Sequence, residues 1–583
     1  MSARCVHLSP ALLGDVRPFG ALAVLQSAAY SRSVQTNAMN GSAVPTSPPA
    51  PPRHCAKMKL GESRKLGPTE ASYYLGARGD GLEGGVNDMY LHIGFRARTG
   101  LVTKERVLDV WSEILHRHAL LCATAEFRDY TEIHFRTTAK ESVGQKAHTR
   151  AQELCMFESG RDASAIISSY LNGPRTLSDH KLSQLLISSP VAGHDFSGTR
   201  NGESHQDFDF FLFSTHYLGD GMALHSTAHE FFSLLSQTDR VTPSSHVQSL
   251  PPPMEAQLET GLVGTSRLAD AVARIDFKRS QAKQIGGHAF PKARLGPRHT
   301  LVPTVSYPPE DTKRALAACK AHGVSIANAM FALSSLAFIR SVEPERRRPE
   351  LPIMLYSALN VRPYLKMEEA NKSDWYHLAI GYYNIILPSF VPTTTSASDN
   401  FWHHAESVKK QTTRVLKSPF LASRTLLMAK RRESQSVGWE READEKRKRE
   451  ATGVQCQPTE DSVPTAGPAE TSIATGVPSL TNGQVSPEAL TGTGVPQPAL
   501  MGLSMLGNLD GIYKHAEYDG IELCSLTTGS RQRPGALLLF AYTFAGKLWI
   551  SLGYDSNGFE AGAIESWWRE LLSGVDEFLL AQN

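Results

Sequence analysis

The sequence predicts an α/β or α+β fold, in which apolar strands are interleaved with long amphipathic helices. Residues 208–215 form a nearly continuous apolar run, as expected of a buried strand. Residues 222–235 then place Leu224, Phe231 and Leu235 on one helical face. Long helices between strands that are not adjacent in sequence are typical of these two classes.

The other expected elements follow from the same periodicities. Gly323 is well placed just beyond the end of one helix, and Ser325 can cap the next, almost wholly apolar helix. The further expected elements are a helix over 107–121, helices over 311–322 and 325–338, a strand over 353–359, a hairpin over 536–553 and a closing amphipathic helix over 564–579.

Composition excludes several classes of protein. Apolar residues make up 41% of the 583 residues, so the chain can bury a large core and is not disordered as a whole. Lys and Arg number 60 against 58 Asp and Glu, so no overall basic field indicates nucleic acid. The longest apolar run, near 535–545, is too short to span a bilayer, and we expect no transmembrane segment and a monomer. Seven scattered cysteines without a C-x-x-C pair fit a reducing compartment without structural zinc.

Two segments differ from the rest of the chain. Residues 1–57 are basic, poor in acids and rich in serine, which is typical of a disordered head or an organellar targeting segment. Residues 440–450 carry ten charges in eleven positions, which is typical of a solvated helix end or a disordered charged run. Residues 451–500 contain seven prolines and no aromatic residue. Such a stretch buries too little apolar surface to offset its ordering entropy, so 432–500 is interpreted as an inserted, mobile loop.

The sharpest local feature is the segment from Thr215 to Gly221, THYLGDG. A buried strand delivers His216 to a turn, where an imidazole with a pKa near neutrality is suited to general-base work. Gly219 and Gly221 permit a tight turn and the close approach of a substrate. Asp220 is a candidate N-cap or partner of a cation. From spacing alone, a hydrogen-bonded structural histidine remains the alternative.

The same segment resembles the H-x-x-x-D-G motif of the chloramphenicol-acetyltransferase-like superfamily of acyltransferases. Further segments resemble that superfamily in the same order along the chain. They are WSEILHRHALLCATAEF (111–127), GVSIANAMFALSSLAF (323–338), SALNVRPYL (357–365), SMLGNLDG (504–511) and LWISLGYDSNGFE (548–560).

The resemblance implies two pseudo-symmetric lobes, 58–305 and 306–583, each with a mixed sheet flanked by helices, and a tunnel between them. His216 would act as the general base inside the tunnel, and no acyl-enzyme would form. Asp220 would pair with Arg362 and hold the loop at Gly221, without taking part in the chemistry. Acyl-CoA would be a co-substrate, and no permanently bound cofactor is expected.

The oxyanion-stabilising group is open at this stage. Asn508 and Ser504 are candidates from the matching segment, with turn formation as the alternative for Asn508. Tyr73-Tyr74 and Trp375-Tyr376 would line the tunnel or belong to the core. His225 and His229 have the spacing of a metal pair, but hydrogen-bonded helix histidines are the preferred interpretation, and no metal is expected.

Within the superfamily, the chain resembles fungal acyltransferases of secondary metabolism that decorate glycolipids of the mannosylerythritol-lipid kind. The expected acceptor is then a sugar hydroxyl, and the donor a short- or medium-chain acyl-CoA. The alternatives are a trichothecene-type acetyltransferase acting on a terpenoid alcohol, a condensation-like enzyme using carrier-protein thioesters, and a non-catalytic binding protein. Thr215 stands where condensation domains commonly have a first histidine. An intracellular location is expected, peroxisomal by resemblance and otherwise cytoplasmic.

Overall fold

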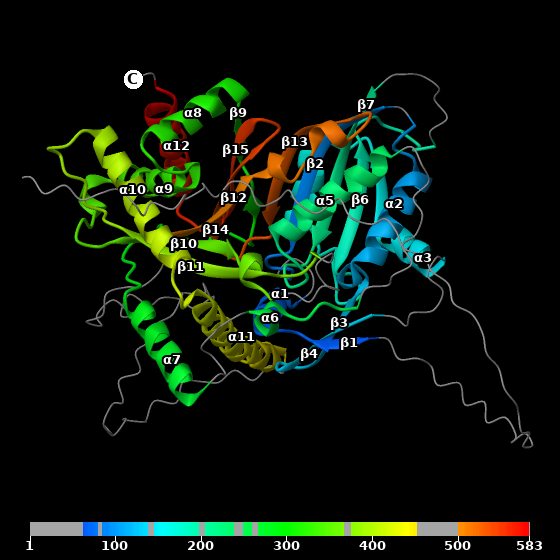
Figure 1. Ribbon diagram of the computed structural model, residues 1–583, viewed down its shortest axis with the longest axis horizontal. Helices are drawn as coiled ribbons and strands as arrows, with labels where there is room; N and C mark the ends of the chain where they lie inside the picture. The colour runs from blue at the N-terminus through cyan, green and yellow to red at the C-terminus, as the bar shows by residue number, and fades with distance from the viewer. Residues whose placement is uncertain are drawn as a thin grey trace, which may run out of the picture. The chain divides into compact units, whose positions relative to one another are not determined.

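Two large mixed sheets, each flanked by helices, form the framework of the protein in its computed structural model (Figure 1). The predicted mixed α/β class is thereby confirmed. The predicted head, residues 1–57, and residues 452–498 of the predicted insertion lie outside the described residues. The structure describes residues 62–79, 84–98, 100–137, 145–197, 205–237, 249–258, 266–366, 375–451 and 499–581.

The first sheet has the strand order β13-β2-β7-β6-β5. Its neighbours are antiparallel except for the parallel pair of β5 and β6. The strands are β2 (Met89–Arg98), β5 (Cys155–Ser159), β6 (Ser183–Ser189), β7 (His205–Ser214) and β13 (Ile521–Ser530). A separate small sheet contains β1 (Ser63–Lys65), β3 (Thr124–Asp129) and β4 (Glu132–Arg136).

The second sheet has the order β11-β10-β12-β14-β15-β8, and β9 also pairs with β15. The predicted strand over 353–359 is confirmed as β10, and the predicted hairpin as β14 and β15. Ala545 and Gly546 take positive φ values of 51° and 70° at its tip, as a tight two-residue hairpin turn requires. The strands are β8 (Thr300–Leu301), β9 (Thr304–Tyr307), β10 (Ile353–Asn360), β11 (Ile380–Leu387), β12 (Met501–Asn508), β14 (Leu537–Phe544) and β15 (Lys547–Asp555).

The predicted helices are present, with one shorter than expected. Ser325 Oγ accepts a hydrogen bond from the Asn328 N–H, and Gly323 has a φ of 64°, so both predicted helix-end signals are confirmed. The helix expected to reach 121 ends at Arg117, because His118 is extended. The helices are α1 (Pro68–Ala77), α2 (Lys104–Arg117), α3 (Gln145–Leu154), α4 (Ala163–Asn172), α5 (Gly221–Ser236), α6 (Met254–Gln257), α7 (Arg267–Ala282), α8 (Pro309–Ala321), α9 (Ile326–Ser341), α10 (Ala397–Leu416), α11 (Leu421–Ala451) and α12 (Ala563–Val575).

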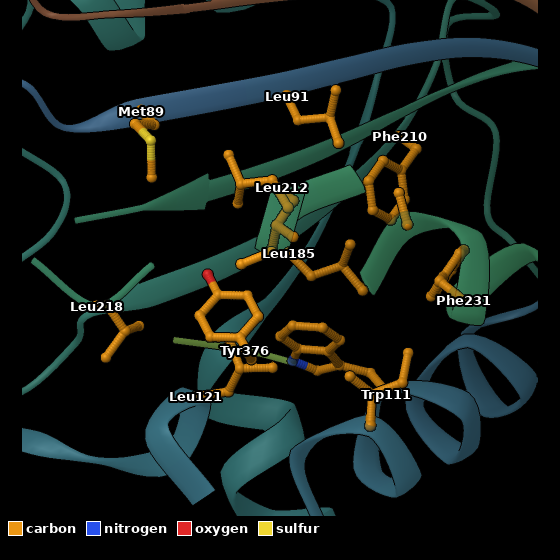
Figure 2. Close-up of a cluster of buried hydrophobic side chains, with 14 of the residues drawn as sticks. Met89, Leu91, Trp111, Leu121, Leu185, Phe210, Leu212, Leu218, Phe231 and Tyr376 are labelled. Carbon is orange, nitrogen blue, oxygen red and sulfur yellow. The ribbon is translucent and has the colours of Figure 1, made fainter. Parts of the chain in front are cut away.

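The core of the first sheet extends into the turn that follows β7. Trp111 of α2 and Phe231 of α5 lie in one buried cluster with Leu91 and Leu212 of the sheet (Figure 2). Leu218, which belongs to the THYLGDG segment, is fully buried in the same cluster. A second cluster joins α9, α10 and α12 to the second sheet. Because Leu218 is anchored in the core, the turn has a rigid base.

The division into lobes at 305/306 needs correction. β8 and the start of β9 precede that boundary, yet they pair with β15 of the second sheet. β13 comes from the C-terminal half but pairs with β2 over residues 521–530, completing the first sheet. Each sheet therefore takes one edge strand from the other half of the chain. β13 completes the first sheet, and β8 completes the second. The described residues from 62 onward accordingly belong to a single compact unit.

The predicted loop 432–500 is also wrong in its first part. Residues 432–451 continue α11, which packs beside α1. Arg78, just after α1, donates to Asp444 at 3.1 Å, and Tyr130 donates to the same carboxylate at 2.6 Å. Val437 packs against the first core cluster. The charged run is therefore the end of a docked helix, in which Asp444 faces Arg78 and Tyr130 and most of the other charges are exposed.

Among the described residues, no single helix has the length and apolar character needed to cross a membrane. The pair α8 and α9 meets those two criteria only when taken together, across a bend of 91°.

Candidate functional site

The turn after β7 is fixed at both ends by hydrogen bonds. At its start, the Thr215 N–H donates to the Leu182 carbonyl at 2.9 Å. At its end, Asp220 is extended and its Oδ1 accepts from the Ala223 N–H at 3.1 Å, which caps α5. The predicted N-cap role of Asp220 is confirmed, and the strand, turn and helix hold His216 between them.

The predicted ion pair between Asp220 and Arg362 is confirmed. Arg362 Nη1 donates to both carboxylate oxygens, at 3.0 and 2.9 Å. Its Nη2 donates to the carbonyl oxygens of Trp375 and His377, at 3.2 and 2.6 Å. Arg362 therefore links the motif turn to the chain that leads into β11.

The carboxylate of Asp220 has its acceptor positions filled. Besides Arg362 and the Ala223 N–H, it accepts from the Ala379 N–H at 2.8 Å. A carboxylate offers about four acceptor positions, and these four hydrogen bonds use them. Burial would raise the pKa of Asp220, but the Arg362 charge and the donated hydrogen bonds lower it below its ordinary value. Asp220 is thus an ionised structural group with no free position for a substrate.

His216 lies in the turn with one ring nitrogen engaged and the ring partly exposed. Its Nδ1 is 3.1 Å from the Gly219 carbonyl oxygen. A carbonyl only accepts, so Nδ1 carries the proton and Nε2 is the unprotonated nitrogen. Burial lowers the pKa of His216 below 6.5, against the opposing effects of backbone hydrogen bonds and of the Asp220 charge, and the Arg432 charge adds the smallest of these contributions, in the lowering direction. The imidazole is therefore neutral at pH 7 and can accept a proton at Nε2.

The glycines of the turn allow close packing of protein groups. A Cβ at Gly219 would lie 3.1 Å from the ring of Tyr376 and 3.2 Å from the Ala223 Cβ. Tyr376 is fully buried and donates to Ser214 Oγ at 2.8 Å. The close approach that Gly219 permits is therefore made by the ring of Tyr376. At Gly221, a Cβ would make an ordinary contact at 3.4 Å with a β12 side chain.

Neither oxyanion candidate contacts His216 by a hydrogen bond in the described part of the chain. Asn508 is exposed, and its Oδ1 accepts from the Asp510 N–H at 3.1 Å and from Thr543 Oγ1 at 3.0 Å. These bonds favour the alternative in which Asn508 shapes a turn. Ser504 lies partly buried within β12, and its role stays a prediction.

Aromatic side chains form the wall beside His216. Tyr73 of α1 stacks on the imidazole, with ring centroids 4.2 Å apart and planes 21° apart. The Tyr73 hydroxyl is hydrogen-bonded to that of Tyr382 on β11. Tyr73 is buried in the first core cluster and also stacks on His216, so it belongs both to the core and to the wall of the site.

Arg432 is the site residue that sequence analysis missed. Its guanidinium lies 4.2 Å from the Tyr382 ring centroid and 5.6 Å from that of Tyr73. The composition of the segment that begins at 432 is typical of a loop, which hides the place of this residue in the site. Buried Leu426 and Ala429, continued by Val437 at helical spacing, were the signal that the helix extends further.

The two histidines of α5 are hydrogen-bonded, as preferred from the sequence. His225 Nδ1 is 2.9 Å from the Tyr513 hydroxyl, and His229 Nδ1 is 2.7 Å from the Tyr518 hydroxyl. Burial lowers the pKa of His225 to about 3, so it is neutral. Within the described ranges, no group of three or more metal-ligating side chains is present.

Several solved structures have a fold similar to that of this protein. No protein-family model and no curated protein matches the chain. The chain is similar to the trichothecene 15-O-acetyltransferase TRI3 from Fusarium sporotrichioides, with a TM-score of 0.64 and 12% identity, over 88% of this chain and 94% of that one. It is also similar to the condensation domain of the monacolin K polyketide synthase MokA, with a TM-score of 0.50 and 10% identity, over 89% and 98% of the two chains.

A third similar structure is the epimerization domain from the third module of tyrocidine synthetase B. Its TM-score is 0.50 at 12% identity, over 89% of this chain and 97% of that one. At these identities the likeness concerns the fold. The protein therefore has the two-lobed mixed α/β fold of the chloramphenicol-acetyltransferase-like and condensation-domain proteins.

Proposed function

We propose that the protein is an acyltransferase that moves an acyl group from acyl-CoA to a hydroxyl of a small-molecule alcohol. One observation carries the proposal: His216 presents an unprotonated Nε2 beside a partly exposed site, while its Nδ1 is held by the Gly219 carbonyl. A fold shared with an acetyltransferase and with a condensation domain supports the same chemistry.

In the proposed reaction, His216 Nε2 takes the proton of the acceptor hydroxyl as its oxygen attacks the thioester carbonyl. The C–S bond of the tetrahedral intermediate then breaks, and the proton passes from His216 to the CoA thiolate. No acyl-enzyme forms. Positioning of the two substrates supplies much of the rate, and general-base assistance adds about 10²–10⁴-fold. Asp220 and Arg362 keep the imidazole in place.

For the acceptor, we propose a sugar hydroxyl of a mannosylerythritol-lipid-type glycolipid, with a short- or medium-chain acyl donor. The resemblance of the chain to fungal acyltransferases that decorate such glycolipids supports this choice. The likeness to a condensation domain favours a second donor class, a thioester on a carrier protein. A terpenoid alcohol, as implied by the likeness to TRI3, is the alternative acceptor.

The test is ester formation by the purified full-length protein. Acyl-CoA donors of two to twelve carbons are combined with a deacylated glycolipid, a terpenoid alcohol and a panel of simple alcohols. Products are identified by mass spectrometry, and thiol release is followed in parallel. We expect ester and free CoA in equal amounts. Transfer only from a phosphopantetheinyl carrier would establish the second donor class, and no ester from either donor would contradict the proposal.

A further inference from the structure

One face of α7 carries aliphatic side chains that lie on the surface of the protein. Leu268, Val272 and Ile275 are 76%, 40% and 54% exposed. Their spacing of four and three residues places them in one stripe along the helix. Figure 1 shows α7 beside α11 and apart from the two large sheets. A contiguous apolar stripe at such a place indicates a contact with another molecule.

A different face of α7 attaches the helix to the protein. Ala273 is buried, and Arg424 of α11 donates to both carboxylate oxygens of Asp276, from Nε at 2.7 Å and from Nη2 at 2.8 Å. The helix packs against α11 on this side. The aliphatic stripe is therefore not needed to hold α7 in place, and substitutions within it should leave the fold intact.

Cations accompany the stripe at its C-terminal end. Arg279 follows Ile275 by four residues and continues the stripe, and Lys278 follows Ile275 by three. Both cations are exposed. Residues 267–283 carry five Lys and Arg against two Asp. One of these acids, Asp276, is already paired with the arginine of α11. The stripe therefore lies in a positive electrostatic field.

The chemistry of this face favours a lipid surface over a protein partner. Protein interfaces are enriched in aromatic residues and depleted in lysine at their centre. This stripe is aliphatic, and Phe277, the aromatic residue of α7, lies on another side of the helix and is partly buried. A second copy of the chain would bring the same cations, and residues 1–57 are themselves basic, so like charges oppose both of these occupants.

We propose that α7 binds the surface of a membrane that contains anionic lipids. Leu268, Val272 and Ile275 enter the boundary between the headgroups and the acyl chains, while Lys278 and Arg279 contact the anionic headgroups. The apolar stems of the two cations extend along the same boundary. The binding is reversible, because three aliphatic side chains supply only a small apolar area. This inference goes beyond the proposed acyl transfer and does not depend on it.

Co-sedimentation of the full-length protein with lipid vesicles tests the proposal. Vesicles of phosphatidylcholine alone are compared with vesicles in which about a third of the lipid is phosphatidylserine. We expect saturable binding to the anionic vesicles and affinity at least about tenfold lower for the neutral ones. Added salt should weaken the binding to anionic vesicles, because it screens the exposed charges. No binding, or equal binding to the two kinds of vesicle, would overturn the proposal.

Two double variants separate the apolar contribution from the charged one. Leu268→Gln with Ile275→Gln removes most of the inserted apolar area and should weaken binding to anionic vesicles by about 10- to 100-fold. Lys278→Gln with Arg279→Gln should weaken it by about 25-fold, at about fivefold for each charge. Both variants should unfold at the wild-type temperature, because all four positions are exposed. Wild-type affinity in either variant would overturn the proposal.

A matched control lies on α8. Lys313→Gln with Leu316→Gln replaces one exposed cation and one exposed aliphatic residue there, and this variant should bind vesicles as the wild type does. A loss of binding equal to that of the α7 variants would overturn the assignment to α7.

Two further measurements test other occupants of the stripe. A dimer in sedimentation velocity that Leu268→Gln with Ile275→Gln dissociates would replace the membrane by a second copy of the chain. Vesicle binding that appears only when 452–498 is replaced by a Gly/Ser linker would show that this acidic segment covers α7, and would overturn the proposal for the full chain. If no ester forms with any donor but the vesicle results are as expected, the acyl transfer is wrong and the membrane site stands.

Discussion

The turn after β7 and the start of the charged half of α11 both lie close to His216, but they use charge in opposite ways. In the turn, Asp220 is buried, paired with Arg362 and saturated by four hydrogen bonds. On α11, Arg432 stacks on tyrosines and pairs with no carboxylate among the described residues. The Asp220 charge, paired with Arg362, holds the shape of the turn, whereas the Arg432 charge lies against the tyrosine rings beside His216.

The largest expected effect comes from two deletions that contrast these regions. Replacing 452–498 by a Gly/Ser linker should leave folding and activity near wild type, because α11 remains whole. Replacing 432–498 by a linker of the same length should abolish activity and lower the melting temperature. It removes Arg432, the bonds from Arg78 and Tyr130 to Asp444, and the packing of Val437. The melting temperature from circular dichroism and the rate of ester formation are measured for both deletion variants. Equal values for the two variants would show that the second half of α11 is dispensable.

Breaking the ion pair should destabilise the protein strongly. Arg362→Gln leaves the buried Asp220 carboxylate without its cation, at a cost of about 3–5 kcal/mol in the free energy of unfolding. Asp220→Ala should also disrupt the cap of α5 and the turn. By contrast, Arg432→Gln should cost no more than about 2 kcal/mol, the upper range of a cation–π contact.

Urea denaturation of Arg362→Gln, Asp220→Ala and Arg432→Gln measures the free energy of unfolding of each variant and so compares the two arginines. An Arg362→Gln protein as stable as the Arg432→Gln protein would contradict the structural role assigned to the ion pair.

The pH dependence of activity should depend on both regions, because both act on His216. Because burial and Arg432 hold its pKa below 6.5, the imidazole stays neutral and active at pH 7. Activity should fall about tenfold per pH unit only once the pH drops below that lowered pKa. In Arg432→Gln the loss of a nearby cation makes protonation easier, so the acid limb should move to higher pH. Profiles of kcat/KM with a neutral acceptor test this, and an unmoved or lowered limb would contradict the electrostatic contact.

The smallest effect is expected at Asn508. Replacing it by alanine removes a side-chain cap on an exposed turn, which costs about 1 kcal/mol of stability. Activity should change less than about threefold. If Asn508 instead donated to the oxyanion, kcat would fall about 10²–10³-fold, so steady-state kinetics of this variant decide between the two roles.

The parts of the fold that could be predicted are those in which the interacting residues lie close together in the sequence. The turn was predictable because its strand, glycines, cap and helix all lie between residues 205 and 236, and because the segment resembles a known motif. The partnership of Asp220 with Arg362 spans 142 positions. It was anticipated from the resemblance and not from periodicity.

The other parts depend on packing between distant segments. The place of Arg432 is set by α1, β11 and α11 together, and no local pattern encodes their meeting. The charges of 440–450 are compatible with a disordered run as well as with a solvated helix end, and only the contacts of Arg78 and Val437 show that one side of this helix is docked. Likewise, β13 joins the first sheet through pairing with β2, which lies more than 400 residues away in the sequence.

The most direct test of the account is the rate of ester formation by His216→Ala at saturating acyl-CoA and alcohol. The side chain is partly exposed and the turn is held by Asp220 and Leu218, so the variant should fold. We predict a fall in kcat of about 10²–10⁴-fold with an unchanged thermal unfolding curve. Ester formation at the wild-type rate by a folded His216→Ala protein would contradict the assignment of His216 as the general base.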